Sequence, residues 1–290
     1  MFIENEYLKV GVTLNGGSLT SIFDKVNNKE LLYQKDVRSW MGQDVVIFPV
    51  IASLKDRECV YEGITYSMKN HGLIRYNTLD VVTHKTDELV LGFKYNNDTL
   101  KQYPFKFNFE VCYKLSLKEL TIEYRVYNID NKDMYFNVGG HPALIVDGYE
   151  VSDKFVFNNV RIEFKEEYNT KQYVLNEVGN LISHTLDIKL PKEMIITKEL
   201  IEEHKTLIYD VKDIDEVILK TNNRKYVFNI SKCDILAIWS KEGFGNFLCV
   251  EPWWGIPDYE STNKKIEDKV LIKKLSSNDS YVTNYKILFD

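Results

Sequence analysis

Strict alternation of side chains runs through Phe105-Lys106-Phe107-Asn108-Phe109-Glu110-Val111-Cys112-Tyr113, where large apolar residues occupy every second position. Because successive side chains of a strand point to opposite faces, this spacing predicts a strand with one buried face. The pattern continues over residues 120–126, where four apolar side chains alternate with polar ones. The centre of the chain is therefore expected to be sheet.

Further strand patterns lie on both sides of this segment. Residues 8–14 alternate in the same way and lead into a turn at 15–17. The apolar runs 217–220 and 226–230 flank a polar turn and predict a hairpin, and residues 285–289 predict a closing strand. The 19 tyrosines and 15 phenylalanines also favour strands. One short helix is expected, near residues 198–206.

The chain shows no linker, repeat or change of composition that would divide it. With 290 residues it is long enough for a large core, so we expect one all-β domain over residues 1–290. Polar segments at 128–132 and 263–269 are expected to be loops, and Gly243-Phe244-Gly245 is expected to form a turn between two apolar strands.

Composition excludes several classes of protein. The net charge is −6 and the six arginines form no basic tract, so we expect no nucleic-acid partner. No run reaches the roughly 18 apolar residues of a membrane helix, and residues 1–6 do not resemble a signal peptide. The four cysteines form no Cys-x-x-Cys pair and are expected to be buried and reduced, which indicates a cytoplasmic protein.

The segment 247–258, Phe-Leu-Cys-Val-Glu-Pro-Trp-Trp-Gly-Ile-Pro-Asp, is the most informative for function. An apolar strand is expected to run into Glu251 and to stop at Pro252. A carboxylate beside two indoles suits a sugar site, because aromatic faces stack on the C–H side of a pyranose while the carboxylate moves a proton. The structural alternative is a glutamate that ends a buried strand beside two core tryptophans.

Two of the five histidines stand in distinctive contexts. His71 is followed by Gly72, which would let the backbone approach a ligand closely, and His141 lies between two glycines and Pro142. Each could instead be a hydrogen-bonded structural residue. The other three, His84, His184 and His204, have polar or undistinctive surroundings and are expected to be solvated.

Other chemistries find little support in the sequence. His71, His141 and Glu251 lack the close spacing of a zinc motif, so no metal is expected, although a His₂Glu site remains a minor alternative. There is no Gly-x-Ser-x-Gly elbow, no phosphate-binding loop and no activated cysteine. What remains is an acid/base set of two imidazoles and one carboxylate, which can move protons on a sugar without any cofactor.

These motifs resemble a known family. His71-Gly72 followed by Arg75, then Gly140-His141-Pro142, then Glu251-Pro252-Trp253-x-Gly255-Ile256 are similar to the motifs of aldose 1-epimerases, or galactose mutarotase-like proteins. The likeness spans essentially the whole chain, in the family's order. It is greatest to the subgroup found with lactose and other sugar operons in bacteria.

The resemblance implies a galactose mutarotase-like β-supersandwich with an open sugar cleft on one sheet. It implies that Glu251 is the general base for the C1 hydroxyl, that His141 is the general acid for the ring oxygen, and that His71 stabilises charge as the ring opens. It further implies a substrate-binding set of Arg75, Asn70, Trp253 and Trp239. For Arg75 a bracing role on the His71 loop is an alternative, as is core packing for Trp239.

One departure from the family concerns specificity. Many relatives carry an arginine after the Ile47-Phe48-Pro49 segment, where this chain has Ser53. The expected partner is a free aldohexose such as glucose or galactose. A hexose 6-phosphate, which would need a cluster of cations, and a non-catalytic sugar-binding role are the alternatives. The sequence is compatible with a monomer or a homodimer.

Overall fold

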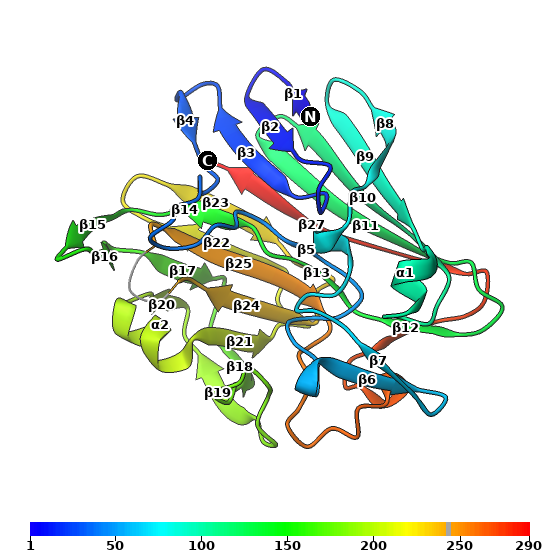
Figure 1. The fold of residues 1–290 in the computed structure, drawn as a ribbon. Helices are drawn as coiled ribbons and strands as arrows, with labels where there is room; N and C mark the ends of the chain where they lie inside the picture. The colour runs from blue at the N-terminus through cyan, green and yellow to red at the C-terminus, as the bar shows by residue number, and fades with distance from the viewer. Residues whose placement is uncertain (242–244) are drawn as a thin grey trace.

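The computed structural model describes residues 1–241 and 245–290. Two large antiparallel sheets dominate the molecule and face each other across a hydrophobic core (Figure 1). The first sheet has nine strands, in the order β20 (Glu193–Ile195), β17 (Arg161–Phe164), β22 (Glu216–Lys220), β23 (Lys225–Asn229), β27 (Ser280–Phe289), β11 (Glu119–Asn128), β10 (Phe107–Ser116), β9 (Glu88–Lys94) and β8 (Asp80–His84).

The second sheet carries the functional residues. Its strands are β19 (Leu186–Leu190), β18 (Tyr168–Tyr173), β21 (Thr206–Asp210), β24 (Ile235–Trp239), β25 (Phe247–Trp254), β13 (Val138–Gly140) and β5 (Val46–Ile47), with β14 (Ala143–Ile145) also beside β25. This arrangement confirms the predicted all-β class.

Smaller elements complete the fold. A four-stranded sheet holds β1 (Phe2–Glu4), β2 (Leu8–Val12), β3 (Leu19–Asp24) and β4 (Lys29–Glu30). Three strand pairs are β6 (Glu58–Tyr61) with β7 (Ile64–Ser67), β12 (Met134–Phe136) with β26 (Lys273–Leu275), and β15 (Gly148–Val151) with β16 (Lys154–Phe157). The helical segments are α1 (Asn97–Leu100), α2 (Lys198–His204) and the 3₁₀ turns η1 (Lys55–Arg57), η2 (Ile74–Tyr76) and η3 (Ile266–Asp268).

Most of the predicted elements are confirmed. The alternating segments form β10 and β11, which pair from Phe107↔Asn128 to Ser116↔Glu119, and β22 and β23 form the predicted hairpin. Helix α2 is confirmed, and the Thr197 side chain caps it by accepting from the Leu200 N–H. The four cysteines are free and buried. The predicted turn at Gly243-Phe244-Gly245 falls largely on residues 242–244, outside the described residues.

Short helical segments other than α2 were not predicted. Helix α1 was not expected; a capping box, in which Asn96 and Thr99 exchange side-chain-to-backbone hydrogen bonds, stabilises its four residues. The 263–269 segment, expected to be a plain loop, contains η3. No helix within residues 1–241 and 245–290 is long and apolar enough to span a membrane.

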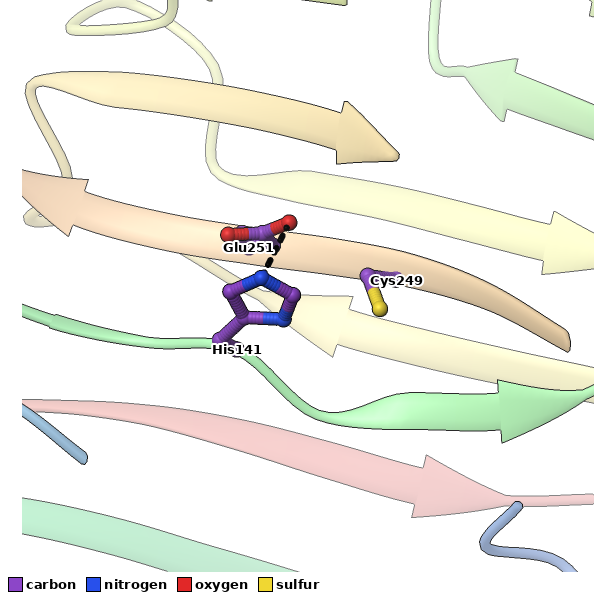
Figure 2. Close-up of side chains that lie close together, drawn as sticks. All are labelled: His141, Cys249 and Glu251. Carbon is purple, nitrogen blue, oxygen red and sulfur yellow. Dashed lines mark ion pairs between the residues drawn. The ribbon is translucent and has the colours of Figure 1, made fainter. Parts of the chain in front are cut away.

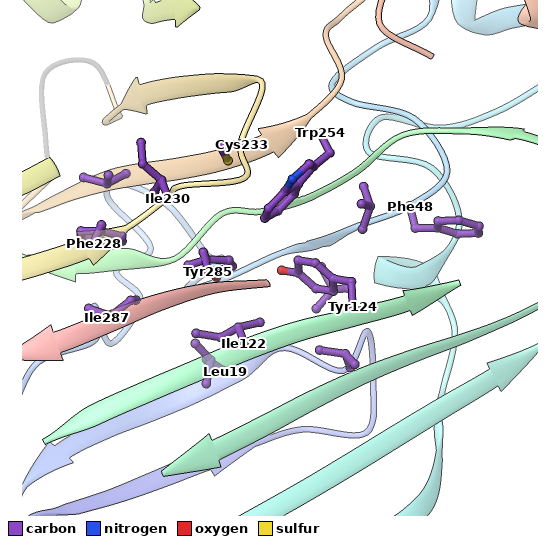
Figure 3. Close-up of a cluster of buried hydrophobic side chains, with 14 of the residues drawn as sticks. Leu19, Phe48, Ile122, Tyr124, Phe228, Ile230, Cys233, Trp254, Tyr285 and Ile287 are labelled. Carbon is purple, nitrogen blue, oxygen red and sulfur yellow. The ribbon is translucent and has the colours of Figure 1, made fainter. Parts of the chain in front are cut away.

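The core lies between the two sheets and takes every second residue of β25. Leu248, Val250 and Trp254 point into the main cluster, where Trp254 packs edge-on against Tyr124 with ring centroids 6.2 Å apart (Figure 3). The intervening positions of β25 therefore face the other side of the sheet. That second set includes Cys249, Glu251 and Trp253, so the period of two brings these three side chains to one face.

Pro252 does not end β25, contrary to the sequence prediction. The strand continues to Trp254, and Pro252 pairs with Leu236 of β24. On the other side of β25, β13 pairs with Trp253 and Trp254 and β14 pairs with residues 247–249, so Pro252 falls between their registers. The Trp253 carbonyl accepts a hydrogen bond from the Asp234 N–H, so the backbone polar groups of Trp253 point toward β24. Those of the preceding residue point the other way, so the Pro252 nitrogen faces the gap between β13 and β14. A proline fits there because its missing N–H leaves no ladder bond unmade.

Candidate active site

A cleft of about 450 Å³ opens on the face of the second sheet that points away from the core. All seven residues that the sequence singled out line it: Glu251, His141, His71, Arg75, Asn70, Trp253 and Trp239. They come from four segments of the chain, at residues 70–75, 141, 239 and 251–253. The sequence therefore identified one continuous surface.

Glu251 and His141 form the centre of the cleft. The Nε2 atom of His141 lies 3.3 Å from Oε1 of Glu251, and the side chains are 9% and 2% exposed (Figure 2). Directly opposite Glu251 on β24 stands Ala237, whose short side chain leaves room for the carboxyl group. The second carboxyl oxygen of Glu251 and the Nδ1 atom of His141 are buried and have no hydrogen-bond partner among the described residues.

Two glycines place His141 over the strand. A Cβ on Gly139 would stand 2.8 Å from Cδ1 of Trp253, and one on Gly140 would stand 2.5 Å from the hydroxyl of Tyr285. Strand β13 can therefore pass between the Trp253 indole and the Tyr285 phenol only without side chains at these positions. His141 follows directly, which brings its ring to the carboxylate.

Backbone hydrogen bonds with Ala52 hold His71. Its own N–H donates to the Ala52 carbonyl at 2.8 Å, and the Ala52 N–H donates to Nδ1 of its ring at 3.3 Å. An Nδ1 atom that accepts a hydrogen bond carries no proton, so Nε2 carries it and is a donor. Burial, with smaller contributions from His141 and Arg75, lowers the pKa of His71 well below 6.5, so the ring is neutral.

Gly72 allows a close backbone approach, but not the approach to a ligand that the sequence predicted. Its backbone adopts a positive φ of 78°, and a Cβ there would lie 2.3 Å from the Phe48 carbonyl oxygen. The close approach is thus to the chain's own backbone rather than to a ligand. Gly72 lets the turn pack on the Phe48–Pro49 segment, and this packing fixes the direction of His71.

Burial dominates the electrostatics of the central pair. It raises the pKa of Glu251 well above 4.5, an effect that the indole of Trp253 partly opposes and the charge of Asp44 reinforces. It lowers the pKa of His141 to about 3. Burial therefore favours the protonated form of Glu251 and the neutral form of His141.

A second buried carboxyl group lies beneath the site. Asp44 is 8% exposed, and its carboxyl oxygens accept from the backbone N–H groups of Leu19, at 2.8 Å, of Val45 and of His141. Burial outweighs these bonds and raises the pKa of Asp44 to about 6. Asp44 therefore ties the His141 turn to β3 and to the segment that leads into β5.

Indole rings surround His141. Trp40 stacks on its ring at 5.3 Å between centroids, and Trp239 meets it edge-on at 5.5 Å. Trp253 lies in the floor of the cleft, 3% exposed, whereas Trp254 belongs to the core. The two adjacent indoles that suggested a sugar site thus point in opposite directions, because neighbouring side chains of a strand alternate.

Comparison with known proteins identifies the family. A model of the family described as "Aldose 1-epimerase" matches residues 2–265. The chain belongs to the aldose 1-epimerase family. It is 26% identical over 299 residues to the chromosomal protein LacX of Lactococcus lactis subsp. lactis, covering 98% of this chain and 97% of that protein.

Solved structures of family members share the fold. A galactose mutarotase-like protein from Lactobacillus casei superimposes with a TM-score of 0.94 at 25% identity, over 100% of this chain and 99% of the other. A galactose mutarotase related enzyme from Lactobacillus acidophilus gives a TM-score of 0.91 at 25% identity, over 100% and 97%.

The position that departs from the aldose 1-epimerase pattern lies on the rim of the cleft. The Ser53 hydroxyl donates to Oδ1 of Asn70 at 3.2 Å, so this part of the cleft holds two short neutral side chains. Arg75 lines the same wall and lies over the Tyr76 ring at 5.1 Å. Contact with the substrate and bracing of the His71 loop both stay predictions for Arg75.

Sequence reasoning missed three residues in or beside this cleft. Trp40 and Asp44 belong to an irregular segment without periodicity, and Cys249 was interpreted only as a buried apolar residue. Trp40 carried a weak signal, an indole within a polar run, whereas nothing in the sequence places Asp44 under His141. Of the three remaining histidines, His84 and His184 are exposed and His204 is partly buried, all outside the cleft.

Proposed function

We propose that residues 1–290 form one carbohydrate-binding catalytic domain, an isomerase that interconverts the α and β anomers of a free aldohexose. The observation that carries this proposal is the contact of 3.3 Å between His141 and Glu251 in a cleft walled by indoles. Family membership supports the reaction class. We place the protein in the cytoplasm, which its four free, buried cysteines support.

The proposed reaction uses the shared proton of the pair. Sugar hydroxyls that donate to Glu251 favour its charged form and move the proton to His141. Glu251 then takes the proton of the C1 hydroxyl while His141 protonates the ring oxygen, and the C1–O5 bond breaks. Rotation about C1–C2 and the reverse transfers close the other anomer. Each well-placed group of this kind contributes roughly 10²–10⁴-fold.

His71 acts as a neutral donor in this scheme. Its Nε2–H faces the same cleft, and the His71 and His141 rings lie 5.5 Å apart in an edge-to-face arrangement. A fixed donor near O5 or O1 stabilises the charge that develops on oxygen as the ring opens. The half-buried face of Trp239 offers a stacking surface for the sugar ring.

The charge of the cleft favours a neutral sugar. Arg75 is the one cationic side chain among the described residues that line it, and Ser53 and Asn70 add no charge. A phosphate dianion is usually bound by several charge-assisted donors. We therefore place hexose 6-phosphates second, and a protein that binds sugar without turnover third.

Polarimetry of freshly dissolved α-D-glucose and α-D-galactose tests the proposal. We expect the wild-type protein to speed the approach to equilibrium and Glu251→Gln to lose roughly 10²–10⁴-fold of that acceleration. Glu177→Gln, at an exposed glutamate beside the cleft residue Val178, is the matched control and should keep the wild-type rate. No acceleration by folded wild-type protein would refute the free-hexose proposal. Acceleration only with hexose 6-phosphates would support the second candidate, and sugar binding without anomer exchange the third.

A further inference from the structure

The proposed reaction gives no role to the thiol of Cys249, which lies close to Glu251 and His141. Cys249 stands two residues before Glu251 on β25, on the same face of the strand, and is fully buried (Figure 2). Its thiol sulfur, a ring nitrogen of His141 and a carboxyl oxygen of Glu251 all lie within 4.8 Å of one another. A thiol is not needed to move protons between C1 and O5. Its position beside both of the groups that do is therefore unexplained by the reaction.

Glu251 and His141 each have a buried polar atom that could bind a ligand. One carboxyl oxygen of Glu251 and the Nδ1 atom of His141 are buried and lack a hydrogen-bond partner among the described residues, although the residues are only 1% and 7% exposed. Buried polar atoms without partners are uncommon and indicate an unfilled interaction. A bound sugar would meet some of this capacity, but it would not use the thiol.

The three side chains are a recognised ligand set. Thiolate, imidazole and carboxylate together select thiophilic divalent cations such as Zn²⁺ over Mg²⁺ or Ca²⁺. Bonds of about 2.0 to 2.3 Å in a tetrahedral arrangement place ligand atoms roughly 3.3 to 3.8 Å apart. A ring nitrogen of His141, a carboxyl oxygen of Glu251 and the Cys249 sulfur lie within 4.8 Å of one another, so side-chain adjustment of about 1 Å would bring the three to these distances.

We propose that His141, Cys249 and Glu251 form a binding site for a thiophilic divalent cation, and that the bound cation inhibits the enzyme. Three protein ligands leave the fourth position open to the cleft, where water completes the shell. On binding, the Cys249 thiol and the Glu251–His141 pair each lose one proton to solvent, and the sulfur forms a bond to the metal with no change of oxidation state. The lone pairs of His141 and Glu251 are then occupied. They cannot exchange protons with the sugar until the metal leaves.

The inhibition rests on the proposed function, whereas the binding does not. Binding is measured with Cd²⁺, a spectroscopic substitute for Zn²⁺, through the ultraviolet charge-transfer absorption of its bond to thiolate, with equilibrium dialysis of Zn²⁺ in parallel. The test variant is Cys249→Ala. Cys112→Ala is the matched control, because Cys112 is also buried and lies 3.9 Å from Glu88 but has no histidine in that contact.

We expect wild type and Cys112→Ala to bind one Cd²⁺ per chain with the thiolate band. Cys249→Ala should lose the band and bind Zn²⁺ at least about tenfold more weakly. An unchanged band in folded Cys249→Ala, or no Cd²⁺ binding by folded wild type, would overturn the site. These measurements decide it even if the protein shows no mutarotation.

Where mutarotation is measured, Zn²⁺ should slow the wild-type protein reversibly, with recovery on adding a chelator. Measured against its own metal-free rate, Cys249→Ala should need at least about ten times more Zn²⁺ than wild type for half-inhibition. Equal sensitivity of Cys249→Ala and wild type would show that inhibition does not come from this site and would overturn that part of the proposal.

Discussion

At the scale of single residues, Glu251 and His141 define the site. Their backbone is held in place by its surroundings, but each side chain has a buried polar atom without a hydrogen-bond partner among the described residues. Glu251 and His141 were identifiable from sequence because glycine and proline around them mark unusual backbone positions. Asp44 was not, because its three partners come from residues 19, 45 and 141, and only the fold brings these together. The sequence thus predicted the reacting groups but not the residue that positions one of them.

Asp44 gives a prediction for stability against pH. Its folded-state pKa of about 6 lies above the ordinary 3.8, so between these values the folded protein holds a proton that the unfolded chain has lost. Stability from this group is therefore full below pH 3.8 and declines as pH rises to about 6, by up to about 3 kcal/mol.

Asp44→Asn removes this titration. An amide oxygen cannot replace both carboxyl oxygens toward three N–H donors, so the variant should be less stable at every pH. The difference in unfolding free energy between wild type and variant should shrink from pH 4.5 to pH 7.5, measured by urea denaturation. A difference that stays constant or grows over this range would contradict the assigned pKa shift.

At the scale of elements, the period of two along β25 explains both the core and the site. Alternate residues turn Trp254 into the core and Trp253 toward the cleft. The sequence analysis did not separate the two indoles, because it ended the strand at Pro252, and whether a proline breaks a strand depends on its neighbours. Here the gap between β13 and β14 accommodates it.

Gly140→Ala tests the placement of His141 by β13. The added Cβ would meet the hydroxyl of the fully buried Tyr285 at 2.5 Å, so the strand must shift. We expect a loss of about 1–3 kcal/mol in stability and a lower kcat/KM. Gly63→Ala is the control: its Cβ meets nothing within 4 Å, but the positive φ of 78° costs about 1–2 kcal/mol. A matched drop in kcat/KM in both variants would show that lost stability, rather than the position of His141, is responsible.

At the scale of the whole molecule, one buried ion pair connects distant parts of the chain around the cleft. The Lys269 ammonium lies 2.7 Å from Asp258, and both side chains are 4% exposed. The other carboxyl oxygen of Asp258 accepts from the Lys55 N–H, and its carbonyl accepts from the Leu181 N–H. The sequence predicted a single all-β fold from strand patterns and family resemblance. It could not predict this contact, because it depends on how three loops meet.

Lys269→Met tests the importance of this connection. It leaves the Asp258 carboxylate buried without its cation, which should cost about 3–5 kcal/mol in urea denaturation. The exposed pair of Lys101 and Asp98 gives the control: Lys101→Met should change stability by less than about 1 kcal/mol. Equal, small effects in the two variants would show that the buried pair does not hold these segments together.

The central claim is that Glu251 and His141 act as one proton-exchanging unit on a sugar. A double-mutant cycle measures this directly: the rate of anomer exchange on galactose is compared for wild type, Glu251→Gln, His141→Gln and the double variant. Groups that act as a unit show losses that do not add. We predict that each single variant loses nearly as much acceleration as the double variant. Losses that multiply independently, or a folded wild type that does not accelerate the exchange, would contradict the account.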